Sequence, residues 1–356
     1  MVEGSAHTPV TTPRPTVSSV AAQAGVSRQT VSNALNNPER LQPETLKRVL
    51  AAIEETGYVR SAAARQMRTA RSGVLAYRLD PVRDGIGGVV LDGFLHALTA
   101  QAEKQDYRVM LYTAESDQDE LRQFSVLTQA RAADAFVLVG THPNDSRYRW
   151  LSGHGVPFSV FGRPWPARGG ASEPAHAWID VDGAAGTARA TRHLLELGHR
   201  SIAFVGWPKG SGTGDERRRG WEEAMAGAGV PPRQRRSLDS SQQDGILTGA
   251  EATTRLLGAG ATAFVCASDS LAVGAFGAVQ AAGARAAVVG FDDSPTAAAL
   301  GISSVRQPLE DAAQWALKSV LSQLDGRRQA PDDSTLLIPE LVVRTSSLPT
   351  PGSTSP

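Results

Sequence analysis

From Val74 to about residue 325, short apolar runs alternate with longer amphipathic segments, and this pattern constrains the fold of the 356-residue chain most strongly. The runs resemble buried strands, and the segments between them have the spacing of helices that bury one face. The apolar runs are VLAYRL (74–79), RVMLYT (108–113), AFVLVG (135–140), PFSVFG (157–162), SIAFVG (201–206), TAFVCA (262–267) and AAVVGF (286–291). The helical candidates are 89–105, 119–130, 183–197, 246–257 and 308–325. This alternation predicts parallel sheets covered by helices, and about 270 residues favour two stacked α/β lobes.

A purely helical segment precedes the α/β pattern. In TVSSVAAQAGVSRQTVSNALNN (16–37), apolar residues recur at helical spacing on both sides of Gly25, which suits the left-handed end of a first helix. Ser27 fits the N-cap of a second helix, and Pro43 fits the first turn of a third helix that Gly57 ends. These signals predict a small all-α helix-turn-helix head.

The second helix of this head is expected to carry a single polar face. That face consists of Arg28, Gln29, Ser32, Asn33 and Asn36. It has no acidic residue, whereas an ordinary solvated helix more often mixes Glu and Lys four residues apart. Arg, Gln and Asn suit the base edges of the major groove, and residues 1–72 carry a net charge of +4. The face therefore predicts binding to duplex DNA.

Residues 16–73 resemble the head and hinge of the lactose-repressor/galactose-repressor (LacI/GalR) family of transcription regulators. The resemblance rests on VAAQAGVS, QTVS and ALN in the head, on ETLKRVLAAIEETGY, and on AAARQM. It implies that the second helix enters the major groove. By position, base edges would be read by Arg28, Gln29 and Asn33, and phosphates or adjoining bases would be contacted by Thr16, Ser27, Ser32 and Asn36.

The same resemblance assigns residues 60–72 to a hinge. Residues 61–69 allow about two helical turns, which are marginal in isolation, so we expect them to become helical on DNA. The resemblance places Ala64 and Met67 at DNA, with Met67 where a leucine usually enters the minor groove. The alternative is a basic linker without this role.

The resemblance continues to about residue 345 through HLLELGHRSIAFVG (193–206), VCASDSLAVGAFGAVQAAG (265–283) and VVGFDDS (288–294). It implies a periplasmic-binding-protein-like body of two Rossmann-like lobes, joined by crossover strands, with an effector in the cleft. The expected organisation is a disordered tail (1–15), the head (16–59), the hinge (60–72), the effector-binding and dimerisation body (73–345) and a second disordered tail (346–356).

Five residues are candidate effector contacts. Asp269 follows the run TAFVCA, and the matching family aspartate binds ligand hydroxyls or amines, although it could simply cap a helix. Arg217 occupies the family's ligand-contacting arginine position, with Thr213 one turn earlier, although the basic run could be a solvated patch. Arg163 and Tyr77 are further candidates.

The nature of the effector is less constrained. An aromatic residue that often stacks on the family's ligands is replaced by Ser240, and Trp165 or Trp207 could supply a stacking surface instead. Family frequency favours a sugar or glycoside, with a nucleoside or purine as the alternative.

Other function classes have weaker support. The glycines of WPKGSGTGDE do not fit a dinucleotide-binding motif, and no catalytic or metal motif is evident, so we expect neither an enzyme nor a cofactor. A solute-binding protein would need an export signal, and Cys266 offers no disulfide. We therefore expect a cytoplasmic homodimeric repressor that binds a near-palindromic operator, with a ligand-binding protein or enzyme lacking operator specificity as the alternative.

Overall fold

The computed structural model describes residues 15–59, 71–79, 88–165, 176–327, 330 and 333–348. It divides into two compact units, residues 1–72 and 73–356, which are described separately below. Residues 1–14 and 349–356 of the predicted tails, and residues 60–70 of the predicted hinge, lie outside the described residues. The predicted disorder is wrong for the start of the C-terminal tail, because η3 (Thr345–Ser347) is a 3-10 turn and the buried Ser347 has its Oγ 2.6 Å from Ser303 Oγ.

The first unit contains a helical head with its own small core. Its helices are α1 (Val17–Ala24), α2 (Arg28–Asn36), the 3-10 turn η1 (Pro38–Arg40) and α3 (Pro43–Thr56). The predicted boundaries are confirmed: Gly25 ends α1 at φ +63°, and the side chain of Ser27 accepts a hydrogen bond from the Thr30 amide. Pro43 opens α3, and Gly57 ends it at φ +64°. Val20, Val31 and Val49 fill the core between the helices.

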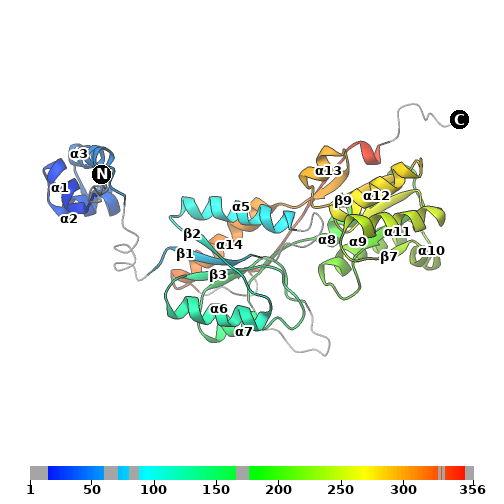
Figure 1. Ribbon diagram of the computed structural model, residues 1–356, viewed down its shortest axis with the longest axis horizontal. Helices are drawn as coiled ribbons and strands as arrows, with labels where there is room; N and C mark the ends of the chain where they lie inside the picture. Colours follow the sequence, from blue (N-terminus) through cyan, green and yellow to red (C-terminus); the bar gives the residue numbers. More distant parts are fainter. Residues whose placement is uncertain are drawn as a thin grey trace, which may run out of the picture. The chain divides into compact units, whose positions relative to one another are not determined.

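The first lobe of the body is built on a four-stranded parallel sheet with the order β2-β1-β3-β4. Its strands are β1 (Val74–Arg78), β2 (Arg108–Tyr112), β3 (Ala135–Leu138) and β4 (Phe158–Val160). Figure 1 shows α5 (Val89–Lys104) and α14 (Leu309–Leu324) on one face, and α6 (Asp117–Gln129) and α7 (Ser146–Gly153) on the other. The strand residues alternate between two hydrophobic clusters because both faces of the sheet are covered.

The second lobe contains a six-stranded sheet with the order β12-β10-β9-β8-β6-β7, parallel except for β12. Its strands are β6 (Ile202–Gly206), β7 (Asp239–Ser241), β8 (Ala263–Cys266), β9 (Ala287–Phe291), β10 (Ser303–Arg306) and β12 (Glu340–Val342). Its helices are α8 (Gly183–Glu196), α9 (Thr213–Gly227), α10 (Pro232–Ser237), α11 (Ile246–Gly258), α12 (Asp269–Ala281) and α13 (Pro295–Ala299). A single hydrophobic cluster, centred on Phe204, Phe264 and Trp221, fills this lobe.

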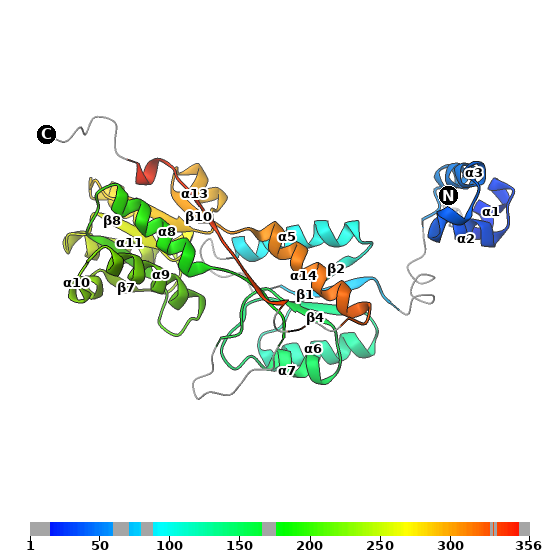
Figure 2. The ribbon, with the colours of Figure 1, turned by 180° about the vertical axis from the view of Figure 1, so that it is seen from behind.

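The chain passes between the lobes three times. It leaves β4 for β5 (Ile179–Val181) and α8, returns from β10 to α14, and crosses again through β11 (Thr335–Leu337) to β12. Strands β5 and β11 pair in parallel as a separate two-stranded sheet. Figure 2 shows the red strand of the last passage running from one lobe to the other. The predicted fold class, an all-α head with a two-lobed α/β body, is confirmed.

Within the described ranges, every helix is too short or too polar to cross a membrane.

Gly220 lies where α9 packs on α8, and a Cβ at this position would collide with the carbonyl oxygen of Ala184. We expect Gly220→Ala to lower the free energy of unfolding by about 1–3 kcal/mol, because the two helices must separate. The measurement is urea denaturation. Gly227→Ala is the matched control at the end of the same helix, where a Cβ meets nothing within 4 Å, and it should be neutral or slightly stabilising. Equal stability of the two variants would contradict this packing argument.

Candidate functional site

The polar face of α2 is presented on the surface of the head. Arg28 and Gln29 are exposed, while Ser32, Asn33 and Asn36 are half-buried. The Gln29 side-chain amide donates to Asn33 Oδ1 at 3.2 Å, so these two candidate base-reading groups hold each other in place. Asn36 Nδ2 donates to the Ser32 carbonyl oxygen at 2.7 Å. The face therefore offers side-chain donors and acceptors on a rigid helix.

Thr16 and Ser27 have a structural task as caps in addition to their predicted DNA contacts. Thr16 forms a capping box with Ser19 at the start of α1, and Ser27 caps α2. Ala64 and Met67 lie outside the described residues.

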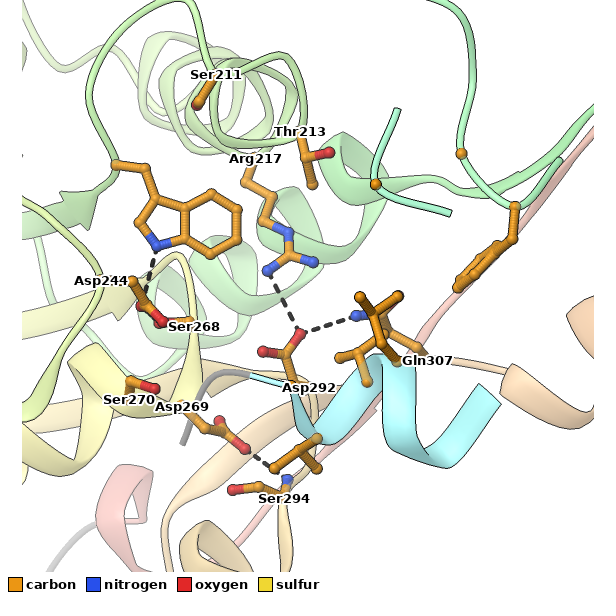
Figure 3. A pocket seen from close by; sticks show the side chains of 18 of the residues that line it. Ser211, Thr213, Arg217, Asp244, Ser268, Asp269, Ser270, Asp292, Ser294 and Gln307 are labelled. Carbon is orange, nitrogen blue, oxygen red and sulfur yellow. Dashed lines mark hydrogen bonds and ion pairs between the residues drawn. The ribbon is translucent and has the colours of Figure 1, made fainter. Parts of the chain in front are cut away.

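A cavity of about 360 Å³ lies between the two lobes of the body, within the size range of small-molecule sites. The first lobe contributes Gly140, Thr141 and Phe161 to its wall, and the second lobe contributes a larger polar set. Figure 3 shows this polar set converging from the ends of several strands and helices. Its members are Trp207, Ser211, Thr213, Arg217, Asp244, Ser268, Asp269, Ser270, Asp292 and Ser294, with Gln307 from the crossover.

Arg217 is the central cation of this wall. Its guanidinium lies 3.7 Å from the ring centroid of Phe291 and 5.1 Å from that of Trp207. Nη1 donates to the Ala267 carbonyl oxygen and lies 3.4 Å from Asp292 Oδ1. Burial lowers the pKa of Arg217, and Asp292 opposes this change, but arginine stays protonated in proteins. The side chain thus presents a fixed positive charge toward the cavity.

Asp292 follows β9 with φ +112°, a conformation that is uncommon for residues other than glycine. Its Oδ1 accepts a hydrogen bond from Gln307 Nε2 at 2.8 Å, as Figure 3 shows. Burial raises the pKa of Asp292 to about 7, although the charge of Arg217 limits the rise. The carboxylate therefore lies at the pocket wall between the guanidinium of Arg217 and the side-chain amide of Gln307.

Asp269 is the first residue of α12, and it is 1% exposed. The N-cap of α12 is the neighbouring Ser268, so helix capping does not account for an aspartate at position 269. Its Oδ2 accepts from the Ser294 amide and its Oδ1 from Ser304 Oγ, both at 2.6 Å. Burial raises the pKa of Asp269, and these hydrogen bonds oppose the rise. The carboxylate is therefore held rigidly at the pocket wall.

Arg163 lies beside the main pocket. It lines a smaller adjoining cavity of about 30 Å³ together with Trp165 and Thr213. Its Nε is 2.7 Å from Asp180 Oδ2, and its Nη1 is 3.4 Å from Glu216 Oε2 on α9. Arg163 therefore ties the segment after β4 to the second lobe.

Tyr77 requires a correction. It is 2% exposed, packs near Phe94 with ring centroids 6.3 Å apart, and donates its hydroxyl to the Leu91 carbonyl oxygen at 3.4 Å. It is absent from the pocket wall because the sheet face that carries it is covered by α5. Its role in this structure is to fill the core of the first lobe.

Ser240, the residue expected to replace a ligand-stacking aromatic, does not line the pocket. Ser240 is buried on β7 and accepts hydrogen bonds from Gln242 and Arg255, away from the pocket wall. Of the two suggested substitutes, Trp207 lines the main pocket and donates to Asp244 Oδ1 at 3.0 Å. Trp165 lines the adjoining cavity and donates to Thr141 Oγ1 at 3.1 Å.

Several polar groups of the wall were not predicted from the sequence. Asp180, Asp244, Asp292 and Gln307 were not proposed, although Asp292 lies in the quoted segment VVGFDDS (288–294). The signal that could have found Asp292 is its position directly after a predicted parallel strand, where open α/β folds bind ligands.

A buried ionic network supports the first-lobe side of the pocket. Arg147 is fully buried, with Nη2 2.6 Å from Asp145 Oδ2 and Nη1 3.2 Å from Glu120 Oε2. It also donates to the carbonyl oxygens of Val139 and Gly140, which lead into the pocket wall. Burial disfavours the charged form of Asp145, but the hydrogen bonds from Arg147 outweigh it and hold the pKa of Asp145 below its usual value. The network fixes the backbone on which Thr141 is presented.

Comparisons with known proteins agree with this geometry. The sequence pattern of "Bacterial regulatory proteins, lacI family" matches residues 16–61, and that of "Periplasmic binding protein-like domain" matches residues 191–347. The transcriptional regulator CelR of Thermobifida fusca is 30% identical over 332 residues, covering 89% of this chain and 94% of CelR.

Solved structures of regulators from the same family also superpose on this chain. A regulatory protein of the LacI family from Chloroflexus aggregans superposes with a TM-score of 0.70 at 30% identity, covering 77% of this chain and 98% of that one. A complex of the regulator CelR with cellobiose superposes with a TM-score of 0.67 at 28% identity, covering 94% of this chain and all of that one. The chain therefore belongs to the lacI family of bacterial regulatory proteins and is a DNA-binding transcription regulator.

Proposed function

We propose that this protein is a repressor that reads its operator with α2 and is controlled by a sugar bound between the lobes of its body. The observation that carries the proposal is the chemistry of the pocket wall, in which fixed carboxylates and one arginine surround a cavity that also has aromatic surface. A protein acting on chromosomal DNA in this way would work in the cytoplasm.

The operator-reading part rests on α2. Its exposed Arg28 and Gln29, with the neighbouring Asn33, are the side-chain types that bind purine edges in the major groove. Since half-site symmetry mirrors protein symmetry, we propose a homodimer on a near-palindromic site. The predicted hinge contacts of Ala64 and Met67 remain part of the proposal.

The sugar part rests on matching hydrogen-bond chemistry. Sugar hydroxyls both donate and accept, so they can donate to the carboxylates of Asp269 and Asp292 and accept from Arg217. Trp207 supplies an apolar ring surface, which can pack on the face of a sugar ring. The complex of the related regulator CelR with cellobiose supports this ligand class. A purine would also stack on Trp207, and it is the second candidate.

The first experiment is selection of bound duplexes from a random DNA pool with the full-length protein at fixed salt. We expect one near-palindromic motif to be recovered, because the proposed dimer presents two α2 helices. Binding that is salt-sensitive but independent of sequence would contradict the assigned role of the α2 face.

Alanine substitution tests which residues read bases. Gln29→Ala or Asn33→Ala should weaken operator binding by about 1–3 kcal/mol and leave binding to random duplexes nearly unchanged, since base contacts carry the specificity. Fluorescence anisotropy with both duplexes measures the difference. Glu54→Ala, an exposed position on α3, is the control and should change neither affinity by more than about twofold. Equal losses on both duplexes would assign Gln29 and Asn33 to phosphate contacts instead.

A thermal-shift and operator-release screen tests the effector site. The panel contains cellobiose, other neutral sugars, nucleosides and purine bases. We expect a sugar to raise the melting temperature and release the operator. Asp269→Asn should weaken this response by about 10–100-fold, because it removes a charged acceptor while an amide can still satisfy Ser294 and Ser304.

Asp239→Asn is the control, since Asp239 pairs with Arg218 outside the pocket wall. A response to purines alone would overturn the sugar assignment. An unchanged sugar response in Asp269→Asn would overturn the role of Asp269.

A further inference from the structure

The balance of charges around the pocket determines which ligands it can admit. Among the described residues of its wall are four carboxylates, those of Asp180, Asp244, Asp269 and Asp292, and a single cation, Arg217. A site built to hold a phosphate or a carboxylate needs cationic donors that are free to face it. Anion binding in this pocket therefore depends on whether Arg217 is free to face the ligand.

Arg217 is already committed to the protein. Its Nη1 donates to the Ala267 carbonyl oxygen and lies 3.4 Å from Asp292 Oδ1. Phe291 covers one face of the guanidinium, with 3.7 Å between Cζ and the ring centroid. Gln307 holds the Asp292 carboxylate in this position at 2.8 Å. Above the pKa of Asp292, which is about 7, the positive charge of Arg217 is thus balanced before any ligand arrives.

A second described cation, which lines the adjoining cavity, is balanced in the same way. Arg163 lies 2.7 Å from Asp180 Oδ2 and 3.4 Å from Glu216 Oε2. Asp244 and Asp269 accept hydrogen bonds from neutral groups and form no ion pair within the described part of the chain. Two carboxylates therefore remain uncompensated at the wall.

We propose that the pocket admits an uncharged sugar and rejects sugars that carry a phosphate or carboxylate, and that Asp292 sets this selectivity by occupying Arg217. The inference rests on the proposed sugar effector and specifies its class. An anionic group would face Asp244 and Asp269, and the described residues of the wall offer it no free cation. Like charges placed next to each other weaken binding strongly. Uncharged hydroxyls can instead donate to these carboxylates.

Arg217 still has a donor for such a ligand. The hydrogen bonds that its guanidinium makes within the described part of the chain all use Nη1, so Nη2 is left to donate to a hydroxyl or ring oxygen in the pocket that Arg217 lines. The arginine can therefore bind a neutral sugar while its charge stays balanced by Asp292.

The substitution Asp292→Asn removes the negative charge of this side chain and nearly keeps its shape, so it tests the effect of the charge alone. Asparagine tolerates the positive φ of this position and can still accept from Gln307. It removes the charge that balances Arg217. The variant should therefore convert the pocket into a weak anion site.

The test uses inorganic phosphate as the probe, with the full-length protein at pH 8 and chloride-matched ionic strength. Calorimetry and thermal unfolding report binding. We expect the pocket of the unsubstituted protein to leave phosphate unbound, and Asp292→Asn to bind it at least about tenfold more tightly. The double variant Asp292→Asn/Arg217→Met should lose this binding. This loss distinguishes phosphate bound in the pocket from phosphate bound by the DNA-reading head.

Asp119→Asn is the charge-matched control, because Asp119 pairs with Arg122 on the surface of α6 and should produce no gain. Phosphate binding by the unsubstituted protein that Arg217→Met abolishes would overturn the proposal. Absence of any gain in a cooperatively folding Asp292→Asn variant would also overturn it.

A second arm uses matched ligands, namely glucose with glucose 6-phosphate, and cellobiose with cellobionate. Where a neutral member stabilises the protein, its anionic partner should bind at least about 100-fold more weakly. Tighter binding of the anionic member would overturn the proposal. The phosphate arm gives its answer even if no sugar binds, so failure of the sugar assignment and failure of the charge selectivity are distinguishable.

Discussion

Burial of the Arg217 guanidinium is the interaction on which the pocket-facing edge of the second lobe depends. A charged side chain that is buried away from water needs carboxylate and carbonyl partners in fixed positions. The structure supplies them from the ends of two neighbouring strands, with the Ala267 carbonyl after β8 and the Asp292 carboxylate after β9. The ring of Phe291 covers the guanidinium between them. These partners fix where the two strands end, and therefore where the pocket begins.

The same strand end connects the pocket to the segments that join the lobes. Asp292 and Asp293 both have positive φ, and such conformations cost about 1–3 kcal/mol each, so they persist only where surrounding contacts require them. Asp292 faces the pocket, whereas Asp293 forms ion pairs with Arg306 and Arg344, at 2.7 and 2.6 Å. Arg306 ends β10 at the start of a crossover, and Arg344 follows β12. The Asp292-Asp293 dipeptide thus links the pocket wall to two passages between the lobes.

The sequence was most informative where a local rule decides the structure. Gly25 and Ser27 fix helix ends by backbone chemistry that needs no distant partner, and both were predicted correctly. Long apolar runs gave β1, β6 and β9 within a residue or two. Strands of three residues such as β5 and β11 were missed, because they have too little periodicity and are stabilised by pairing with each other.

Most residues that line the pocket could not be predicted from local sequence, because they come together only in the tertiary structure. Arg217 and Asp269 were found only through family resemblance, since many arginines and aspartates share their local patterns. Asp180 and Asp244 were missed because nothing local indicates which carboxylates converge on one cavity. Tyr77 was predicted to contact the effector but is buried in the core of the first lobe, which fits its place in the apolar stretch VLAY (74–77) of a strand covered on both faces.

The walls of the pocket explain how a bound ligand could act on the operator. Thr141 and Phe161 come from the first lobe and Arg217 from the second, so a ligand can distinguish lobe arrangements by touching both. Only such a difference in affinity can shift the equilibrium between them. Moving a population from 99:1 to 1:99 requires about 5.5 kcal/mol, which two pockets of the proposed dimer could share at about 2.7 kcal/mol each. A few charge-assisted hydrogen bonds made in one arrangement suffice for this. Because β1 of the first lobe begins at Val74, directly after the predicted hinge, a displacement of this lobe moves the point from which the hinge leaves the body.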